Sequence, residues 1–376
     1  PIANGFLKKK DFKKEYFFNL SVAFNNNLSL FQLKNNPHPK KMFNKNYPFF
    51  TSSSKNMISH FKKFSRWIKK NFAKKKKFKI LEIGSNDGTF LINFKDSYHI
   101  GIEPSESVHK VALKNNINSK NKFFNRKSIN EFVKKKILFD VIVGSNVICH
   151  IPNQKQLIGN VKKILQKEGV FIFEEPYLGS MYEKVSYDQI YDEHIFMFSA
   201  SSISKIYKKF GMQLVDVIPQ KTHGGSMRYV IKNKKNIKIS KRLKKILDYE
   251  RKKNIDNFKG CIKFKKQVEK SKRKLKEKVL QIKDMNQKIC GYGATSKSTT
   301  ILNYCGINQK YIDCIYDTTP YKIGKYSPGT HIPILNYKLF KKGGYKNVFL
   351  FAWNHKQEIM KKEKKLRNIN WFSHLN

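Results

Sequence analysis

Short runs of apolar residues without polar alternation recur through the middle of the chain. They lie at residues 78–83, 98–102, 139–146 and 169–173. Strands that are buried on both faces, as in parallel sheets, show this pattern. Segments with apolar residues at helical spacing follow several of these runs, for example Phe90 to Phe94, Val108–Asn115 and Val161–Gln166. The succession of these runs and helical segments predicts a parallel sheet covered by helices.

Two later strands complete this predicted sheet. Gln213–Val217 and Met227–Ile231 alternate more than the earlier runs, and residues 219–226 separate them. Alternation is typical of strands with one exposed face, so we expect an antiparallel pair at the edge of the sheet. A helix near Ser202–Phe210 precedes the pair.

The N-terminal part shows a less regular pattern. Phe17–Val22 and Leu28–Leu33 predict two short strands joined by residues 23–27. An apolar stripe at helical spacing predicts a helix from Ser52 onward. The charge run Lys74–Lys77 is interpreted as a solvated surface hinge before the first core strand.

A second α/β unit follows a basic helical stretch. Lys238–Lys288 contains no proline and one glycine, which predicts a long helical connector. Beyond it, the strands Ile312–Tyr316 and Val348–Trp353 and the helix Ser298–Tyr304 are expected. The sequence therefore predicts an α/β protein in four parts: an N-terminal lobe at 1–52, a Rossmann-like domain at 53–237, the connector at 238–287 and a second Rossmann-like domain at 288–376.

The composition narrows the class of protein. The 376 residues carry a net charge of +50, yet only seven of the 77 basic residues are arginine. Lys, Asn, Ile and Phe are over-used together, which is typical of an A/T-rich coding sequence and spreads lysine over the whole surface. We therefore expect no specific nucleic-acid site, although such a surface favours anionic substrates, including nucleotide diphosphates.

The cysteines and the hydropathy predict a cytoplasmic, soluble protein. The five cysteines show no Cys-x-x-Cys pair and no metal-ligand spacing, and they are interpreted as buried apolar residues in a reducing compartment. No apolar run approaches membrane-spanning length, and no signal segment is recognised. We expect a monomer or homodimer without a membrane partner.

The stretch from Lys79 to Pro104 carries the first candidate site. Glu82-x-Gly84-x-x-x-Gly88 follows a predicted strand, with Asn86 and Asp87 in the turn. The spacing is not that of a pyrophosphate-binding loop, and an acidic loop suits a ligand with a ribose and a cationic centre. Glu103 ends the next strand, where its carboxylate can accept both ribose hydroxyls.

The second glycine loop has the opposite charge. Gly291-x-Gly293-x-x-x-Lys297 lies between a strand and a helix, so free N–H groups and a lysine predict a diphosphate site. Between the two loops, Tyr191-Asp-Glu-His194 offers a hydroxyl, a carboxylate and an imidazole suited to general base chemistry. The alternative is that His194 has a structural role and makes its hydrogen bonds within a turn.

These motifs together resemble one family. Residues 82–88, 191–194, 222–226, 291–294, 303–306 and 328–331 are similar to the nucleotide-sugar C-methyltransferases, which act on 4-keto-deoxyhexoses. The similarity spans nearly the whole chain, and Pro1–Asn4, Phe31–Leu33 and Tyr47–Phe49 resemble pieces of the family's N-terminal lobe. The resemblance implies a class I methyltransferase fold, the cofactor S-adenosylmethionine (SAM) and a nucleotide-diphosphate sugar substrate.

The resemblance also implies roles for individual residues. His194 would generate an enolate by removing a proton beside the ketone, with Glu193 orienting it and Tyr191 as a donor; His150 is the rival base. The expected cofactor contacts are Glu82, Gly84, Asn86, Asp87, Gly88, Glu103, Pro104 and Asn146. The expected substrate contacts are Glu175, Tyr177, His223, Gly293, Ala294, Lys297 and Asn303.

One departure from the family concerns its N-terminal zinc site. Asn25–Leu28 stand where a second Cys-x-x-Cys is expected, and the first pair is missing, so no structural zinc is predicted. Two alternatives stay open: a SAM-dependent enzyme acting on another anionic substrate such as RNA, and a non-catalytic scaffold with a SAM-binding fold.

Overall fold

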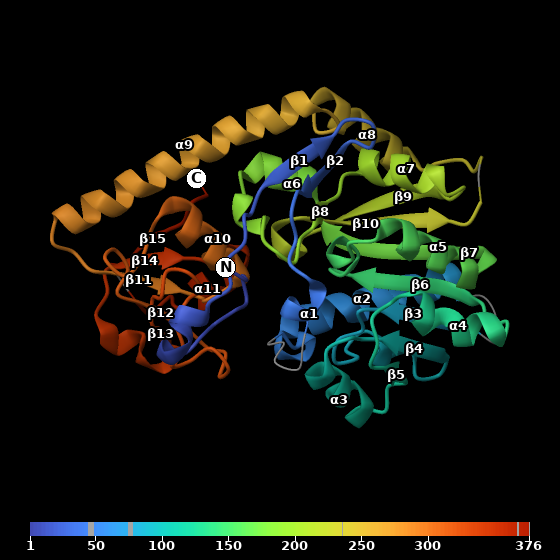
Figure 1. Cartoon of the computed structure of the whole chain (residues 1–376), viewed down its shortest axis with the longest axis horizontal. Coiled ribbons are helices and arrows are strands. Elements are labelled where there is room, and N and C mark those ends of the chain that lie inside the picture. The colour runs from blue at the N-terminus through green and yellow to red at the C-terminus, as the bar shows by residue number, and fades with distance from the viewer. Residues whose placement is uncertain (44–48, 74–77, 235, 367, 376) are drawn as a thin grey trace.

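The computed structural model describes residues 1–43, 49–73, 78–234, 236–366 and 368–375. Two sheets, one mixed and one parallel, form the cores of two domains, and a long helix joins them (Figure 1). The predicted hinge at Lys74–Lys77 and most of the Tyr47–Phe49 motif lie outside the described residues. In the part of the chain that is described, no helix has the length and apolar content to cross a membrane.

The larger domain is built on a seven-stranded sheet. Its strands, in spatial order, are β5 (Ser119–Lys120), β4 (Tyr98–Ile102), β3 (Lys79–Ile83), β6 (Phe139–Ser145), β7 (Leu165–Pro176), β10 (Ser226–Lys232) and β9 (Gln213–Gln220). The first five are parallel, and β10 runs antiparallel to both of its neighbours. This order and the antiparallel pair confirm the predicted class I methyltransferase fold.

Each face of this sheet is buried by its own set of helices. On one face, Ile80 and Val143 pack with α2 (Lys55–Phe72), α3 (Glu106–Lys114) and the 3-10 helix Leu91–Phe94. On the other face, Leu81 and Ile142 pack with α4 (Arg126–Lys134), α5 (Gln154–Ile164) and α7 (Ala200–Lys209). Burial on both faces explains why the strands are continuously apolar.

The helix predicted after Gly88 is shorter than expected. A single 3-10 turn, Leu91–Phe94, replaces it. The reason is the short connection: β4 already begins at Tyr98, which leaves no room for an α-helix of several turns between the two strands.

The smaller domain contains five parallel strands. Their spatial order is β13 (Ile334–Asn336), β12 (Cys314–Asp317), β11 (Ile289–Tyr292), β14 (Asn347–Leu350) and β15 (Asn370–Phe372). The helices α10 (Ser296–Cys305) and α11 (Lys356–Lys362) belong to this domain. A second parallel α/β unit was predicted, and it is present.

The connector consists of two helices instead of one. α8 (Lys241–Lys252) and α9 (Phe258–Asp284) are separated at residues 253–257, where Asn254 has a positive φ of 59° and Asn257 caps α9. α9 runs along one side of the molecule from the larger to the smaller domain (Figure 1). Its buried residues join the core of the smaller domain.

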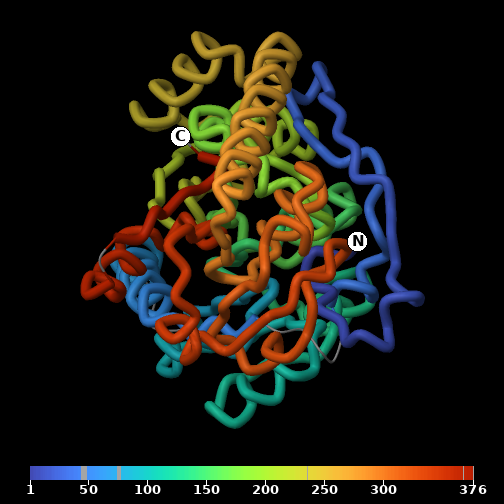
Figure 2. The backbone as a smooth tube through the Cα atoms, turned by 90° about the vertical axis from the view of Figure 1, so that its left-hand side faces the viewer, coloured from blue at the N-terminus to red at the C-terminus, as the bar shows by residue number. Residues whose placement is uncertain are grey.

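The N-terminal segment touches both domains. Its hairpin, β1 (Val22–Asn25) and β2 (Leu30–Leu33), pairs with β8 (Phe196–Met197) of the larger domain. The strand predicted at Phe17–Val22 is wrong, because the pairing starts only at Val22 and the largely exposed side chains of Phe17 to Leu20 contribute nothing to a core. Figure 2 shows this segment running along one side of the molecule. The short helices α1 (Pro39–Met42) and α6 (Leu178–Lys184) complete the α-helices.

Candidate active site

One large cavity receives residues from both domains. Its volume is about 1390 Å³, and Glu103 and His194 of the larger domain line it together with Lys297 and Asp317 of the smaller one. Asn4 of the N-terminal segment lines it as well. Ligand pockets usually measure about 300–1,000 Å³, so the space is sufficient for a cofactor and a substrate side by side.

The glycine turn after β3 lies close to Val147, in the segment that follows β6. Gly84 has a φ of 66°, and a Cβ at this position would come within 2.6 Å of Val147 Cγ2. No larger residue fits without displacing Val147. Predicted cofactor residues Glu82, Gly84, Asn86, Glu103, Pro104 and Asn146 line this side of the cavity.

Buried carboxyl groups line this side of the cavity. Glu103 accepts hydrogen bonds from the backbone of Asn86 (2.9 Å) and Ser105 (2.7 Å). The Oε2 atom of Glu82 is buried and has no hydrogen-bond partner among the described residues. Burial raises the pKa of Glu82 well above its usual range, and the charges of Asp87 and Glu103 raise it further. A cationic ligand with hydroxyl groups fits these residues, and SAM carries both features.

Two predicted cofactor contacts lie behind the cavity wall. Asp87 accepts hydrogen bonds from Ser52 N (2.8 Å) and Thr89 Oγ1 (2.5 Å), so its carboxylate fixes the segment before α2. Neither Asp87 nor Gly88 lines the cavity. The described contacts of Asp87 are structural, and direct contact of Asp87 and Gly88 with the cofactor stays a prediction.

The imidazole of His194 is held at both nitrogens. Its Nδ1 lies 2.8 Å from the carbonyl oxygen of Gln189, and its Nε2 lies 2.8 Å from the hydroxyl of Tyr191. Because a carbonyl can only accept, Nδ1 carries the hydrogen and Nε2 accepts from Tyr191. Burial lowers the pKa of His194 well below its usual range, and the neighbouring His150 lowers it further, so the ring is neutral near pH 7.

Glu193 does not orient His194, which corrects the prediction. Its carboxylate accepts a hydrogen bond from Asn4 Nδ2 (2.6 Å), and Asn4 Oδ1 accepts one from Ser296 Oγ (2.9 Å). Burial raises the pKa of Glu193, and the charge of Asp192 adds to this shift. The N-terminal segment thus connects the acid–base motif with the glycine loop of the smaller domain. Asn4 belongs to the Pro1–Asn4 motif that resembles the family's N-terminal lobe, but no role was predicted for this residue.

Glu175 and Tyr177 have structural partners, and their predicted place in the sugar pocket stays a prediction. Glu175 Oε1 accepts hydrogen bonds from the backbone at residues 147–149, with the shortest at Ile148 (2.6 Å), and thereby fixes the 3-10 helix Ile148–His150. Tyr177 donates to Glu250 Oε1 (2.9 Å). Both side chains are buried and neither lines the cavity.

The glycine loop of the smaller domain is only partly available to a ligand. Lys297 and Gly293 line the cavity, and the Lys297 ammonium lies 4.6 Å from the centre of the Trp353 ring. Ala294 N donates to Asp317 Oδ2 (2.7 Å), so this amide must leave Asp317 before it can bind a diphosphate, and its use there stays a prediction. Asp317 is the last residue of β12, and Glu103 follows directly after β4, so a strand-terminal acid is the signal that could have identified Asp317.

Of the predicted substrate contacts Asn303 and His223, only His223 lines the cavity. Asn303 donates to the carbonyls of Thr299 (2.8 Å) and Pro328 (3.0 Å) and does not line the cavity, so its contact with the substrate stays a prediction. His223 lines the cavity, and its Nε2 lies 3.0 Å from Asn146 Nδ2. Burial and then the Lys297 charge lower the pKa of His223 to about 3. His150, the rival base, also lines the cavity.

Comparisons with known families and curated proteins agree with this architecture. A family model described as a methyltransferase domain matches residues 57–217, and one described as a C-methyltransferase C-terminal domain matches residues 221–371. The chain is similar to the C-methyltransferase NovU of Streptomyces niveus, with 26% identity over 368 residues. This alignment covers 97% of the chain and 87% of NovU.

Solved structures with distant similarity include two methyltransferases. One is a SAM-dependent methyltransferase from Clostridium acetobutylicum, with 14% identity and a TM-score of 0.38 over 46% of this chain and 92% of that protein. The other is magnesium protoporphyrin IX methyltransferase from Synechocystis with bound SAM. It has 11% identity and a TM-score of 0.35 over 46% of this chain and 78% of that protein.

Proposed function

The chain belongs to the SAM-dependent C-methyltransferases, and we propose that it methylates a carbon next to the ketone of a nucleotide-linked 4-keto-deoxyhexose. The observation that carries the proposal is the arrangement of a single cavity. An acidic cofactor side, a neutral imidazole and a buried lysine all face the same space.

His194 is the proposed base because its neutral Nε2 has a lone pair at the cavity. An unactivated sugar carbon is not a nucleophile, so a proton beside the ketone must be removed first. The proton passes to Nε2, which requires the Tyr191 hydroxyl to turn away from this nitrogen. That hydroxyl is then available to donate to the enolate oxygen.

The lowered pKa of His194 makes it a weak base in the free enzyme. The negative charge that develops on the enolate stabilises the imidazolium that forms beside it, so the proton transfer becomes more favourable as it proceeds. Bound SAM supplies an electrophilic methyl group for the enolate carbon.

The smaller domain is proposed to bind the diphosphate. The Lys297 Nζ is buried and has no hydrogen-bond partner within the described ranges. Burial lowers the pKa of Lys297, which means that the ammonium is poorly compensated. An anionic ligand next to it removes part of this cost.

A panel of nucleotide-linked 4-keto sugars tests the proposal. The enzyme, SAM and each sugar are incubated, and mass spectrometry detects the addition of one methyl group. Without SAM, the carbon beside the ketone is expected to exchange hydrogen for solvent deuterium. Failure of both transfer and exchange across the panel refutes the proposed substrate class. Methylation of RNA that declines on moderate salt addition supports the other anionic substrate instead.

A further inference from the structure

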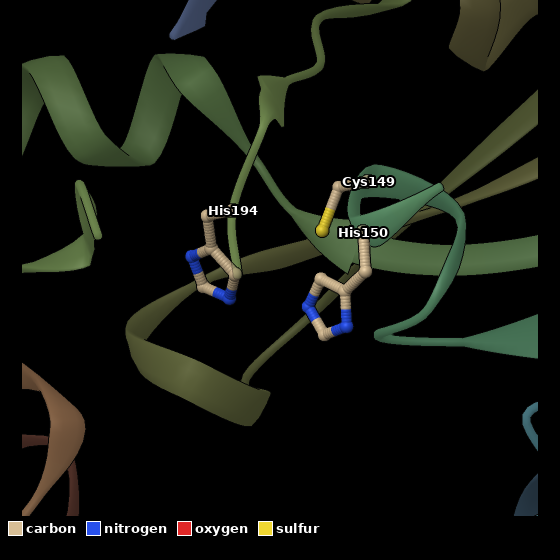
Figure 3. A group of neighbouring side chains, drawn as sticks. All are labelled: Cys149, His150 and His194. Atoms are coloured by element: carbon tan, nitrogen blue, oxygen red, sulfur yellow. The ribbon is translucent and has the colours of Figure 1, made fainter. Parts of the chain in front are cut away.

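Three potential metal ligands meet at the wall of the cavity. Cys149, His150 and His194 each offer one ligand atom, and these atoms all lie within 4.8 Å of one another. All three side chains are buried. Figure 3 shows the two imidazole rings facing each other, with the sulfur of Cys149 beside them. The proposed reaction does not require these three groups to be together.

The Nε2 atoms of His194 and His150 are placed to act as metal ligands. His194 Nδ1–H is engaged by the Gln189 carbonyl, which leaves the lone pair on Nε2. A second ring nitrogen held by a backbone carbonyl is the usual arrangement of metal-ligating histidines. His150 Nε2 is buried and has no hydrogen-bond partner in the described part of the chain.

We propose that Cys149, His150 and His194 form a three-ligand Zn²⁺ site whose fourth position opens to the cavity. One sulfur and two imidazole nitrogens select zinc over magnesium or calcium, which prefer oxygen ligands. On binding, the Cys149 thiol loses its proton to solvent and a sulfur–zinc bond forms. All five cysteines are free thiols, so no disulfide competes for this sulfur.

The distances require a small closure of the site. Bonds of about 2.0–2.3 Å in a tetrahedral site place ligand atoms about 3.3–3.6 Å apart. The side chains must therefore approach one another by roughly an ångström. Cys149 and His150 share the 3-10 helix that Glu175 fixes, so His194 and its Tyr191 contact are the parts that adjust.

Occupation of this site inhibits the enzyme. A zinc ion on Nε2 of His194 uses the lone pair that accepts the substrate proton, and it separates this nitrogen from the Tyr191 hydroxyl. This consequence rests on the proposed role of His194, whereas binding of the metal ion does not.

Cobalt provides a direct test of binding without any substrate. The full chain is titrated with Co²⁺, and a thiolate-to-cobalt charge-transfer absorption is expected, which Zn²⁺ then abolishes. Cys149→Ala should lose this absorption and weaken Zn²⁺ binding at least about tenfold, the scale on which even outer-shell changes act. Cys261→Ser, which alters a distant thiol on α9, should behave as the wild type. Absence of the absorption in the wild type, or its persistence in Cys149→Ala, overturns the site.

Inhibition is measured separately. Methyl transfer by the wild type and by Cys261→Ser should fall on Zn²⁺ addition and return with a chelator. Cys149→Ala should need at least about ten times more Zn²⁺ for the same loss. Equal sensitivity of all three proteins overturns the inhibitory role.

If Cys149→Ala does not fold, Cys149→Ser takes its place. If no sugar is turned over, the cobalt titration still decides whether the site exists, so failure of the two proposals can be distinguished.

Discussion

His194 is held in one tautomer by the Gln189 carbonyl and the Tyr191 hydroxyl, and this geometry makes its substitution informative. His194→Gln retains polar atoms but cannot accept a proton with comparable basicity. Turnover should fall about a hundredfold or more, and deuterium exchange without SAM should fall in parallel. SAM affinity should be unchanged, and His109→Gln on α3 serves as a distant control. Turnover and exchange at wild-type levels would move the base to His150 or Tyr191.

Glu103 provides a residue-scale test of the cofactor side. Its carboxylate is fixed by the backbone of Asn86 and Ser105 and faces the cavity. Glu103→Ala should weaken SAM binding at least tenfold, or about 1.4 kcal/mol, because charge-assisted hydrogen bonds are lost. Calorimetry measures the affinity, with the exposed Glu131→Ala as a matched control. Equal affinity in both variants contradicts the assignment.

At the scale of elements, Glu250 of α8 fixes the start of α7. Its carboxylate accepts hydrogen bonds from the backbone N–H groups of Ala200 (2.7 Å) and Ser201 (2.8 Å) and from the Tyr177 hydroxyl. A carboxylate at a helix N-terminus is favoured by the helix dipole. Glu250→Gln should lower the free energy of unfolding by about 1–3 kcal/mol, measured by urea denaturation.

Tyr177→Phe tests whether this residue is structural. It should lower stability less than Glu250→Gln, since it removes one neutral donor, and KM for the sugar should not change. A large rise in KM with wild-type stability would restore Tyr177 as a substrate contact and contradict the buried position described above.

At the scale of the whole molecule, the two domains should bind different ligands. Lys297 belongs to the smaller domain and the acidic turn to the larger one, and both line the same cavity. Lys297→Ala should raise KM for the nucleotide sugar about tenfold, as for loss of one charge-assisted contact, and leave SAM affinity alone. Lys283→Ala, on the surface of α9, is the control. A loss of SAM affinity in Lys297→Ala would show that the division between domains is wrong.

The neutral histidines of the cavity should make the protein sensitive to acid. Burial lowers the pKa of both His150 and His223 to about 3, whereas an unfolded histidine titrates near 6.5. The unfolded state therefore binds more protons below pH 6.5, and stability is lost as the pH falls from 6.5 towards 3. Each such histidine should contribute about 1.4 kcal/mol per pH unit within this window.

Substitution of one of these histidines measures how much that residue contributes to the pH dependence of the free energy of unfolding. His223 has a φ of 53°, a conformation that asparagine tolerates, so His223→Asn is the suitable change. The free energy of unfolding, measured between pH 6.5 and 5, should vary less steeply in this variant by about 1.4 kcal/mol per pH unit. An unchanged slope would mean that His223 is not buried in its neutral form.

The sequence by itself determined the features that depend on neighbouring residues. Apolar runs specified the central strands of both sheets, whereas the edge strands β5, β13 and β15 were not predicted. The alternation in Gln213–Val217 and Met227–Ile231 correctly predicted the antiparallel pair. Acidic residues at strand ends, such as Glu103, and the turn at Gly84 could also be predicted from the sequence, because the end of a parallel strand and the residues after it are adjacent in the chain.

Only the tertiary structure decided which polar groups meet. Asn4 and Glu193 are 189 residues apart, yet they share a hydrogen bond, and Asp317 occupies the amide of Ala294. Cys149 and His150 approach His194 in the same way, across segments whose spacing predicts no metal site. Local patterns specify elements because backbone geometry repeats over a few residues. Contacts between distant side chains depend on how those elements pack, and for that reason the partners of His194 and Glu193 could not be predicted from the sequence.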